Sequence, residues 1–210
     1  MTQGKFSVIS RRLRDLCLMF GVLLLILLSP YAAMAGWETE CADCPHQFSD
    51  MGPGSLALDA DMLPHVAYGG DNLYYAYYDG VSWQTETVDN GKGVGEFTSL
   101  VLDSSGRPHI SYYDRINKNL KYAWYDGASW QIETVDSGTG VGKYTSLALD
   151  SSGKPHISYA GAGLKYAYYD GVSWQIETVD AGYKGHTSLK LDSSDRPHIS
   201  YYEYPVGWSG

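Results

Sequence analysis

The 210-residue sequence is poor in cysteine, in positive charge and in helical periodicity. Fifteen Lys and Arg residues stand against 24 Asp and Glu residues, which gives a net charge of −9. A surface of this sign repels phosphate backbones, so nucleic acid is excluded as an expected partner. No segment beyond residue 35 shows the 3.6-residue apolar spacing of an amphipathic helix, and the expected class is therefore all-β.

The sequence has only one long apolar run, the 13 residues from Leu16 to Leu28. A membrane-spanning helix needs about 20 such residues, so this run is too short to cross a bilayer. Four basic residues precede it, and Ala33-Met34-Ala35 supplies the small residues of a signal-peptidase site. We therefore expect a signal peptide over residues 1–35 and a protein exported to the periplasm or the extracellular space, which contacts the membrane only before cleavage. A retained membrane anchor is the alternative.

Cysteine is scarce, and only Cys41 and Cys44 lie beyond the predicted signal peptide. Two cysteines this close in an exported protein favour a disulfide. Nothing around the pair resembles the strand–helix unit of a thioredoxin-like redox motif. Haem attachment would require His directly after Cys44, where Pro45 stands, and a zinc site would require four ligands where Cys41, Cys44 and His46 supply three. No metal and no cofactor is expected.

The sequence is rich in repetition. One phrase occurs four times, anchored by Ser55, Ser99, Ser146 and Ser188 at spacings of 44, 47 and 42 residues, and a second phrase rich in Tyr and Trp lies between successive copies. The first phrase occurs as LDADMLPHVAY, LDSSGRPHISY, LDSSGKPHISY and LDSSDRPHISY, and the second as YYAYYDGVSWQTETVD, KYAWYDGASWQIETVD and KYAYYDGVSWQIETVD. A repeat of this length that is built from short strands is typical of a β-propeller blade.

Each repeat divides into four short strands, which in the second repeat are expected at residues 99–103, 108–113, 120–125 and 129–135. Turn sequences link them, among them Asp126-Gly127 before the last strand. The third strand is apolar or aromatic on both faces, which favours a sheet between two neighbours over a two-layer sandwich. The predicted fold is thus a β-propeller of four-stranded blades of about 42–47 residues, with units at 55–98, 99–145, 146–187 and, in part, 188–210.

The partial fourth unit raises the question of how such a ring closes. Residues 36–54 carry the Cys-x-x-Cys pair, and their Trp37-Glu38-Thr39 resembles the start of the fourth strand of a repeat. If this segment pairs with the last hairpin, the ring closes by strand exchange between the two ends. The alternatives are an open array that a second chain completes, as a homo-oligomer, and a truncated relative of a longer propeller.

The four copies of the first phrase carry His65, His109, His156 and His198 at one position. Asp103 and Ser111 recur in step with His109, and so does the tryptophan of the second phrase. Because buried polar groups must be paired, repetition of the same polar set indicates a structural hydrogen-bonded network. A channel of four histidines that binds a metal is the alternative, and we favour the structural network.

The turns at residues 79–83, 126–130 and 170–174 share the sequence Asp-Gly-x-Ser-Trp. They resemble the Asp-box turns of sialidase-type propellers, and the repeat over residues 55–202 resembles the BNR-like arrays of exported bacterial proteins. The match is partial, because an Asp box places Ser two residues before Asp and does not place Gly directly after it. Sialidase catalysis implies an arginine cluster and a tyrosine–glutamate pair, whereas only Arg107, Arg115 and Arg196 lie beyond the signal peptide. The resemblance therefore supports the propeller more than an enzyme.

Planar Tyr and Trp rings at repeated positions suit stacking against sugar rings in several equivalent pockets. The candidate ligand-binding residues are Tyr112, Tyr113, Tyr201, Tyr202, Trp83, Trp130 and Trp174. Core packing is the alternative role for these rings. The predicted function is an exported, non-catalytic binding module for a glycan or another cell-surface polymer. A sialidase-type glycoside hydrolase or its remnant, and a structural or protein-interaction module of a larger assembly, are the alternatives.

Overall fold

The computed structural model describes residues 7–11, 37–43, 50–182 and 184–203. Within these ranges every regular element is a β-strand, as the missing helical periodicity predicts, and no helix there is long and apolar enough to cross a membrane. The predicted cleavage site at Ala33-Met34-Ala35 lies outside the described residues.

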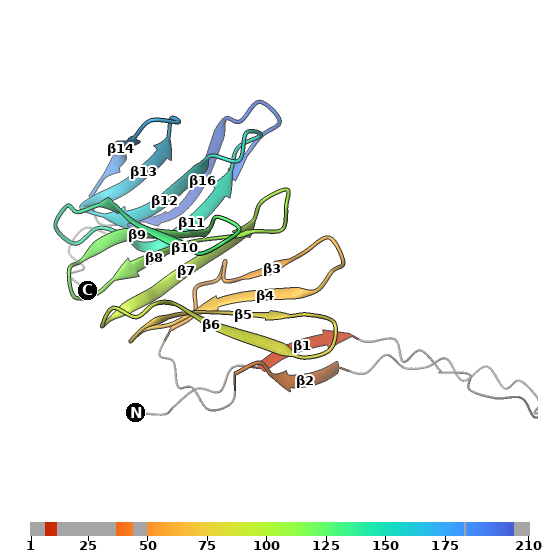
Figure 1. Ribbon diagram of the computed structural model, residues 1–210. Helices are drawn as coiled ribbons and strands as arrows, with labels where there is room; N and C mark the ends of the chain where they lie inside the picture. Colours follow the sequence, from red (N-terminus) through yellow and green to blue (C-terminus); the bar gives the residue numbers. More distant parts are fainter. Residues whose placement is uncertain (1–6, 12–36, 44–49, 183, 204–210) are drawn as a thin grey trace, which may run out of the picture.

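Three complete units each form one antiparallel sheet of four strands in sequence order (Figure 1). The first comprises β3 (Leu56–Leu58), β4 (Pro64–Tyr68), β5 (Leu73–Tyr78) and β6 (Trp83–Asp89). The second comprises β7 (Val94–Leu102), β8 (Pro108–Asp114), β9 (Asn119–Tyr125) and β10 (Trp130–Asp136). The third comprises β11 (Lys143–Leu149), β12 (Pro155–Gly161), β13 (Gly163–Tyr169) and β14 (Trp174–Ala181). The four predicted strands of the second unit are confirmed, except that β7 begins earlier, at Val94.

The Asp-Gly turns before the last strands are held by the aspartate itself. Asp126 Oδ1 accepts the backbone N–H groups of Ala128 and Ser129 at 2.8 and 2.9 Å. These hydrogen bonds lower the pKa of the Asp126 carboxyl. Gly127 adopts a φ of 102°, a conformation that favours glycine, so the position after the aspartate requires this residue. The turn thus fixes the position of the tryptophan that begins the last strand of each unit.

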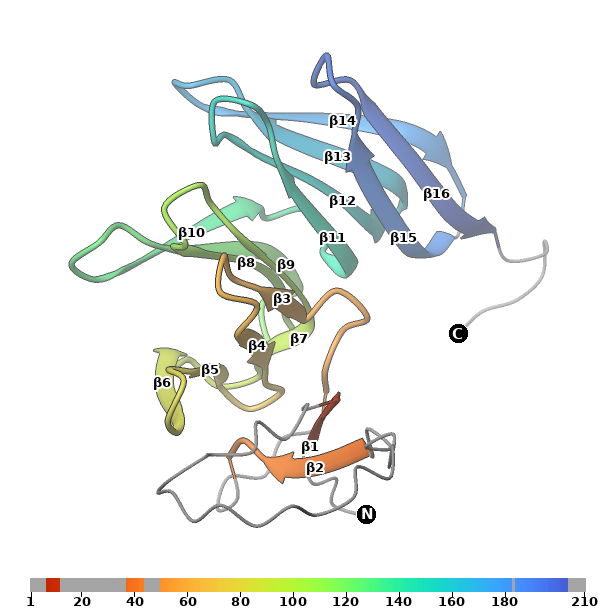
Figure 2. The same cartoon turned by 90° about the vertical axis from the view of Figure 1, so that its right-hand side faces the viewer.

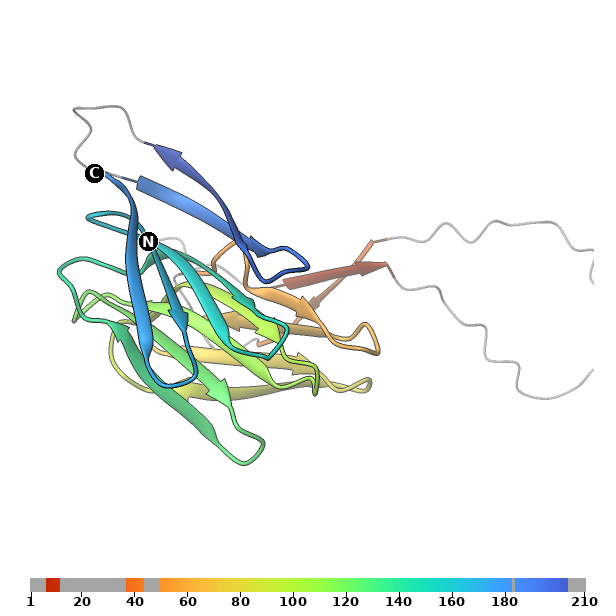
Figure 3. The same cartoon turned by 90° about the horizontal axis from the view of Figure 1, so that it is seen from above.

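The sheets stack face to face, and each hydrophobic core is shared between two units (Figures 1 and 3). One core joins Leu73 and Tyr75 of the first sheet to Leu100 and Tyr112 of the second. The next core joins Tyr122 and neighbouring residues of the second sheet to Leu147 and Tyr159 of the third. The first strand of each sheet packs on the first two strands of the preceding sheet. This radial repetition of four-stranded sheets is the propeller arrangement, and not a two-layer sandwich.

Closure by strand exchange, one of the three alternatives for the partial fourth unit, is not formed among the described strands. β15 (Lys184–Leu191) and β16 (Pro197–Glu203) make a two-stranded sheet after the third unit, while β1 (Ser7–Arg11) and β2 (Trp37–Cys41) make another before the first unit. Figure 2 shows these two pairs at opposite ends of the stack. The residues after β2 explain its place, because Asp43 accepts the Tyr68 hydroxyl at 2.5 Å and Ala42 packs on the first sheet.

The same contact recurs at each junction, where Asp89 accepts the Tyr112 hydroxyl and Asp136 accepts the Tyr159 hydroxyl, both at 2.7 Å. β2 therefore does correspond to the fourth strand of a unit, as the Trp37-Glu38-Thr39 motif indicated, but it precedes the first sheet instead of pairing with β16. β1 lies in the stretch predicted as a signal peptide. Cys41 is disulfide-bonded; its predicted partner Cys44 lies outside the described residues, so that pairing stays a prediction.

Candidate functional site

The histidines of the complete units are buried beside a tyrosine of the third strand. The Nδ1 atoms of His65, His109 and His156 lie within hydrogen-bonding distance of the hydroxyls of Tyr75, Tyr122 and Tyr166, respectively. The Nε2 atoms face the aspartates at the end of the first strand, with His109 Nε2 at 3.8 Å from Asp103 Oδ2. In the last hairpin, His198 is exposed and its Nε2 lies 3.3 Å from Asp192. The histidines therefore take part in one repeated polar contact.

Burial lowers the pKa of His65, His109 and His156, although the neighbouring aspartates oppose the shift. Burial would raise the pKa of the Asp103 carboxyl, but hydrogen bonds from Arg107 outweigh it and leave the pKa lowered. The lowered pKa favours the neutral form of these three buried imidazoles. Across the described part of the chain, no group of three His, Cys, Asp or Glu side chains is placed to hold a metal ion.

Ser111 was predicted to share the histidine network, and the structure corrects this. Its hydroxyl donates to Thr145 Oγ1 of the next unit at 2.8 Å. The side chain therefore stabilises a junction between sheets. The partner of His109 that sequence reasoning missed is Tyr122, although a tyrosine recurs at this position in all three complete units.

Two equivalent pockets lie at the two junctions between complete sheets. The first pocket has a volume of about 260 Å³ and is lined by His65, Tyr75, Tyr77, Glu86, Gly106, Pro108, Tyr125 and Trp130. The second pocket has a volume of about 290 Å³ and is lined by His109, Tyr122, Trp124, Glu133, Gly153, Lys154, Pro155, Tyr169 and Trp174. Nearly every residue of one pocket has its counterpart in the other. The repeat therefore builds the same kind of site twice.

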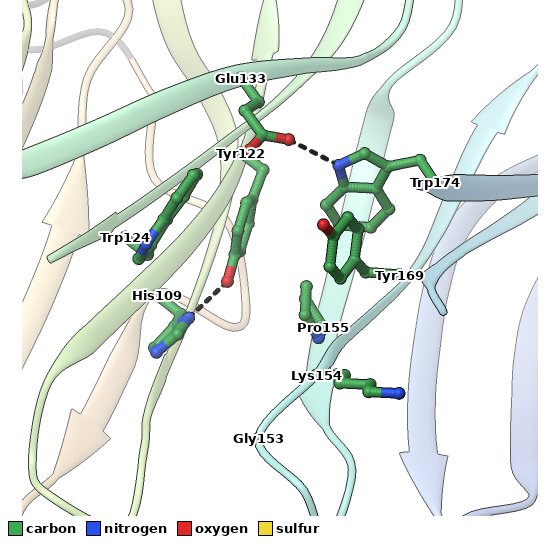
Figure 4. Close-up of a pocket in the computed structure, with 9 residues that line it drawn as sticks. All are labelled: His109, Tyr122, Trp124, Glu133, Gly153, Lys154, Pro155, Tyr169 and Trp174. Atoms are coloured by element: carbon green, nitrogen blue, oxygen red, sulfur yellow. Dashed lines mark hydrogen bonds between the residues drawn. The ribbon is translucent and has the colours of Figure 1, made fainter. Parts of the chain in front are cut away.

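In each pocket a tryptophan of the later unit donates to a glutamate of the earlier one. The Nε1 atom of Trp174 lies 2.8 Å from Glu133 Oε2, and that of Trp130 lies 2.7 Å from Glu86 Oε2. Figure 4 shows Trp174 and Tyr169 on one side of the second pocket and Tyr122 and Trp124 on the other. The Trp174 ring meets Tyr122 edge-on, with ring centroids 5.5 Å apart. The tryptophan is thus held by a hydrogen bond and by ring packing.

The two pockets differ at two positions. Tyr77 of the first pocket corresponds to Trp124 of the second. Lys154 lines the second pocket and donates from Nζ to the Asp170 carbonyl at 2.8 Å. The corresponding Arg107 forms an ion pair with Asp103 at 2.7 Å and does not line the first pocket. The second pocket, at about 290 Å³, is the larger of the two, and it has one more cation at its border.

Of the predicted ligand-binding rings, the structure brings Trp130 and Trp174 into pockets. Trp83 packs against the cluster of Val66, Tyr68 and Ala76 before the first sheet, and its Nε1 is buried with no hydrogen-bond partner among the described residues. Its position in the strand matches that of the other two, but among the described residues only the pair β1–β2 precedes its sheet.

The predicted tyrosine pairs lie elsewhere. Tyr112 is fully buried and donates to Asp89, and Tyr113 is buried beside Phe97, so both rings are packing residues. Tyr201 and Tyr202 are exposed on β16, and the Tyr201 hydroxyl donates to Asp180 at 2.5 Å. The pocket residues that were not selected from the sequence include Glu86, Glu133, Tyr125 and Tyr169. For the glutamates the signal was the repeated Trp-Gln-x-Glu motif, and for the tyrosines it was their place directly before the repeated Asp-Gly-x-Ser-Trp turn.

Arg107, Arg115 and Arg196 form ion pairs with nearby carboxylates, and Arg115 also reaches Asp71 of the preceding unit at 3.9 Å. Arg107 pairs with Asp103, Arg115 with Glu96 and Arg196 with Asp192. These three side chains line neither pocket. They therefore do not form the convergent cluster that sialidase-type recognition of a carboxylate implies.

No protein-family model matches the chain, and no curated protein matches it. Among solved structures it is similar to a fucose lectin from Kordia zhangzhouensis, solved with methyl-fucoside, with a TM-score of 0.42, 20% identity and coverage of 60% of this chain and 97% of the lectin. It is also similar to an intramolecular trans-sialidase from Ruminococcus gnavus, with a TM-score of 0.45, 16% identity and coverage of 71% and 38%. A bifunctional GH43-CE protein from Bacteroides eggerthii gives a TM-score of 0.43, 13% identity and coverage of 71% and 22%.

The chain thus spans well under two thirds of both enzymes. The fold assignment itself rests on the sheets and their stacking.

Proposed function

We propose that the protein is an exported, non-catalytic propeller-type module that binds glycans in the pockets between its sheets. The observation that carries the proposal is the repeated arrangement of a tryptophan fixed to a glutamate beside further aromatic rings, Trp130 with Glu86 and Trp174 with Glu133. It occurs twice with nearly the same lining. A ligand pocket of this kind combines apolar walls with a few placed polar groups.

The chemistry of the lining suits a sugar ring. Tyr169 and Trp174 offer flat apolar surfaces, and a sugar presents an apolar face of similar size. A carboxylate has about four acceptor positions on its two oxygens. Since the indole N–H of Trp174 occupies one of them, Glu133 keeps acceptor capacity for sugar hydroxyls in a fixed orientation. Stacking on the rings and hydrogen bonding to Glu133 thereby act on one ligand.

The charges favour a neutral glycan. Glu86 is the only acidic residue that lines the first pocket and Glu133 the only one that lines the second, and a bound anion would meet this carboxylate. Glycoside hydrolysis generally uses two carboxyl groups placed about 5–10 Å apart across the scissile bond. Each pocket offers one, which supports binding over hydrolysis.

The decisive experiment is a binding titration with a neutral glycan displayed densely on a polymer. The double variant Glu86→Gln/Glu133→Gln keeps the shape of both pockets and removes both charges, and we expect it to lose binding. Either single variant should retain weaker binding, because linked sites gain about 10²-fold or more in avidity when both engage. Asp61→Asn is the matched control, since it removes one negative charge from an exposed turn outside both pockets.

Unchanged binding by the double variant would overturn the assignment of the pockets. New reducing ends in the bound glycan, produced by the parent chain and abolished in the double variant, would instead establish a hydrolase. Thermal unfolding of each variant checks that a loss of binding reflects the pocket and not the fold.

A further inference from the structure

A polar cavity of about 440 Å³ lies beside the second pocket, between the turns that join the first two strands of the second and third units. Ser104 of the second unit and Asp150 of the third are among the residues that line it. His109 and Gly153 line both cavities, so the two adjoin there. Figure 4 shows this border at the lower end of the second pocket. We call the polar cavity the turn cleft.

The junction between the third sheet and the last hairpin shows what such a turn binds. There the backbone N–H and the hydroxyl of Ser151 donate to the two carboxylate oxygens of Asp195, at 2.9 and 2.6 Å. Asp195 adopts a φ of 60°, which is uncommon for a residue other than glycine, and it holds the place in the last hairpin that Gly153 holds in the third unit. The turn of the third unit thus binds a pair of oxygens that the next unit supplies.

The corresponding donors of the turn cleft have no such partner. Ser104 matches Ser151, and neither its backbone N–H nor its hydroxyl makes a hydrogen bond within the described part of the chain. A Cβ placed on Gly153 would meet nothing within 4 Å. The space that the Asp195 carboxylate fills in one junction is therefore open in the other, beside two unused donors.

The charges of the turn cleft distinguish a hydroxyl from a carboxylate. In the last hairpin, Asp192 Oδ2 accepts from the guanidinium of Arg196 at 2.7 Å. The counterpart Asp150 lacks this partner, because Lys154 donates to a backbone carbonyl instead, and its Oδ2 accepts no hydrogen bond from any described residue. A group that satisfies the cleft must donate to Asp150 and accept from Ser104. A hydroxyl does both, whereas an ionised carboxylate only accepts.

We propose that the second pocket and the turn cleft together bind two linked sugar units of a neutral glycan. One sugar stacks in the pocket, and the hydroxyls of the next sugar accept from Ser104 and donate to Asp150. The pocket alone, at about 290 Å³, lies at the lower end of the range of roughly 300–1,000 Å³ for ligand sites, and the adjoining cleft adds the space for a second ring. The assignment rests on the proposed function of the pocket and adds the length of glycan that this junction recognises.

The first junction lacks the matching groups. Ala60 holds the place of Ser104, and its side chain offers no hydrogen bond to a hydroxyl. Asp103 holds the place of Asp150, and its Oδ2 already accepts from Arg107 at 2.7 Å. We therefore expect the first pocket to recognise one sugar unit and the second pocket to recognise two, although their linings are nearly the same.

The test measures each junction separately, by NMR titration with methyl glycosides of glucose, galactose and mannose and with their neutral disaccharides. Glu86→Gln leaves the second pocket as the working site, and Glu133→Gln leaves the first. In the Glu86→Gln background we expect the best disaccharide to bind about tenfold tighter than its monosaccharide, a gain that two net hydrogen bonds provide. In the Glu133→Gln background we expect no such gain.

A variant that fills the turn cleft sharpens the test. Gly153→Asp, in the Glu86→Gln background, supplies the carboxylate that Asp195 supplies in the last hairpin, and it should abolish the gain from the second sugar. Gly106→Asp is the matched control, because it adds the same side chain at the equivalent turn of the first junction. It should leave the gain unchanged. Ser104→Ala, a small change in an exposed turn, should reduce the gain and leave thermal unfolding unchanged.

Three results would be decisive against the assignment. Equal affinity for a monosaccharide and its disaccharides in the Glu86→Gln background overturns it, while the proposed function stands. Tighter binding of a disaccharide whose second unit is a uronic acid also overturns it, since a carboxylate would then be the preferred group. If the parent chain binds neither the free sugars nor the polymer display, the proposed function fails, and the assignment fails with it.

Discussion

The same Pro-His-Ile-Ser-Tyr sequence occurs in the middle of the array and at its end, in two different environments. In β8 every residue from Pro108 to Asp114 is buried, while in β16 nearly every residue from Pro197 to Glu203 is exposed. The local sequence and the strand are the same, and the neighbours differ. β8 lies between β7 and β9 and under the third unit, whereas β16 pairs only with β15 among the described strands.

One contact survives at the end of the array. Tyr201 donates to Asp180 of the preceding sheet, as Tyr112 donates to Asp89 in the interior. The link to the preceding unit is therefore made by the first two strands alone, and the later strands and the next unit supply the burial. In this protein a residue of the first two strands is buried only where another sheet packs on it. Three experiments compare the buried and the exposed environment.

The largest difference is expected at the aspartate that ends the fourth strand. Asp89 accepts the Tyr112 hydroxyl and binds Lys121 in a mostly buried site. Asp89→Ala leaves Lys121 partly buried without its ion-pair partner, which costs about 3 kcal/mol or more in the free energy of unfolding. The counterpart Asp180 is only half-buried, and its partner Lys184 also pairs with Glu203 at 2.6 Å, so Asp180→Ala leaves that cation with a carboxylate and a smaller loss is expected. Urea unfolding of both variants measures the difference, and equal losses would contradict the comparison.

The next difference concerns the histidines. His109→Ala removes the partner of the buried Tyr122 hydroxyl and should cost about 1–3 kcal/mol in the free energy of unfolding. His198→Ala changes an exposed side chain and should leave the unfolding midpoint nearly unchanged. Thermal unfolding of the two variants is the measurement. A large loss for His198→Ala would show that the last hairpin is buried in solution.

The smallest effect is expected from pH. Burial lowers the pKa values of His65, His109 and His156 in the folded state, so their neutral forms favour folding above the unfolded value of about 6.5. As the pH falls from about 7.5 to 5.5, the unfolded chain binds more protons and this contribution is lost. Unfolding titrations across this window should show a falling free energy. His109→Gln should flatten the slope, because it removes one of the three buried imidazoles.

The contacts inside a unit were largely predictable from sequence, because local patterns determine them. Asp126-Gly127 predicted the turn before the last strand, and Pro108 predicted the start of the second strand. The recurring Asp103 and His109 predicted a shared polar contact. The missed strand start at Val94 has a local cause. A register shift at Glu96 interrupts the ladder with β8, and no alternating pattern announces it.

The contacts between units were not predictable in this way. Ser111 reaches Thr145, and Trp174 reaches Glu133, across 34 and 41 residues of chain. The local sequence does not determine which face of a strand packs on the next sheet. Tyr112 and Tyr113 were therefore predicted to bind a ligand, although both are buried. Trp130 and Trp174, selected from the same repeat, do line the pockets at the junctions, and their ligand-binding role stays a prediction. A ring at every junction can be both a packing element and a pocket wall.

The shared cores have a consequence for how such a chain changes by gene duplication. Each core, each tryptophan–glutamate pair and each pocket belongs to a junction, and a recombination event that inserts one more repeat inserts one more junction with all three. No residue needs to adapt, because the new unit meets neighbours identical to those of the unit it copies. The near identity of the phrases in the second and third units fits growth by such a step. The number of pockets in this protein therefore follows from the number of repeats that its gene encodes.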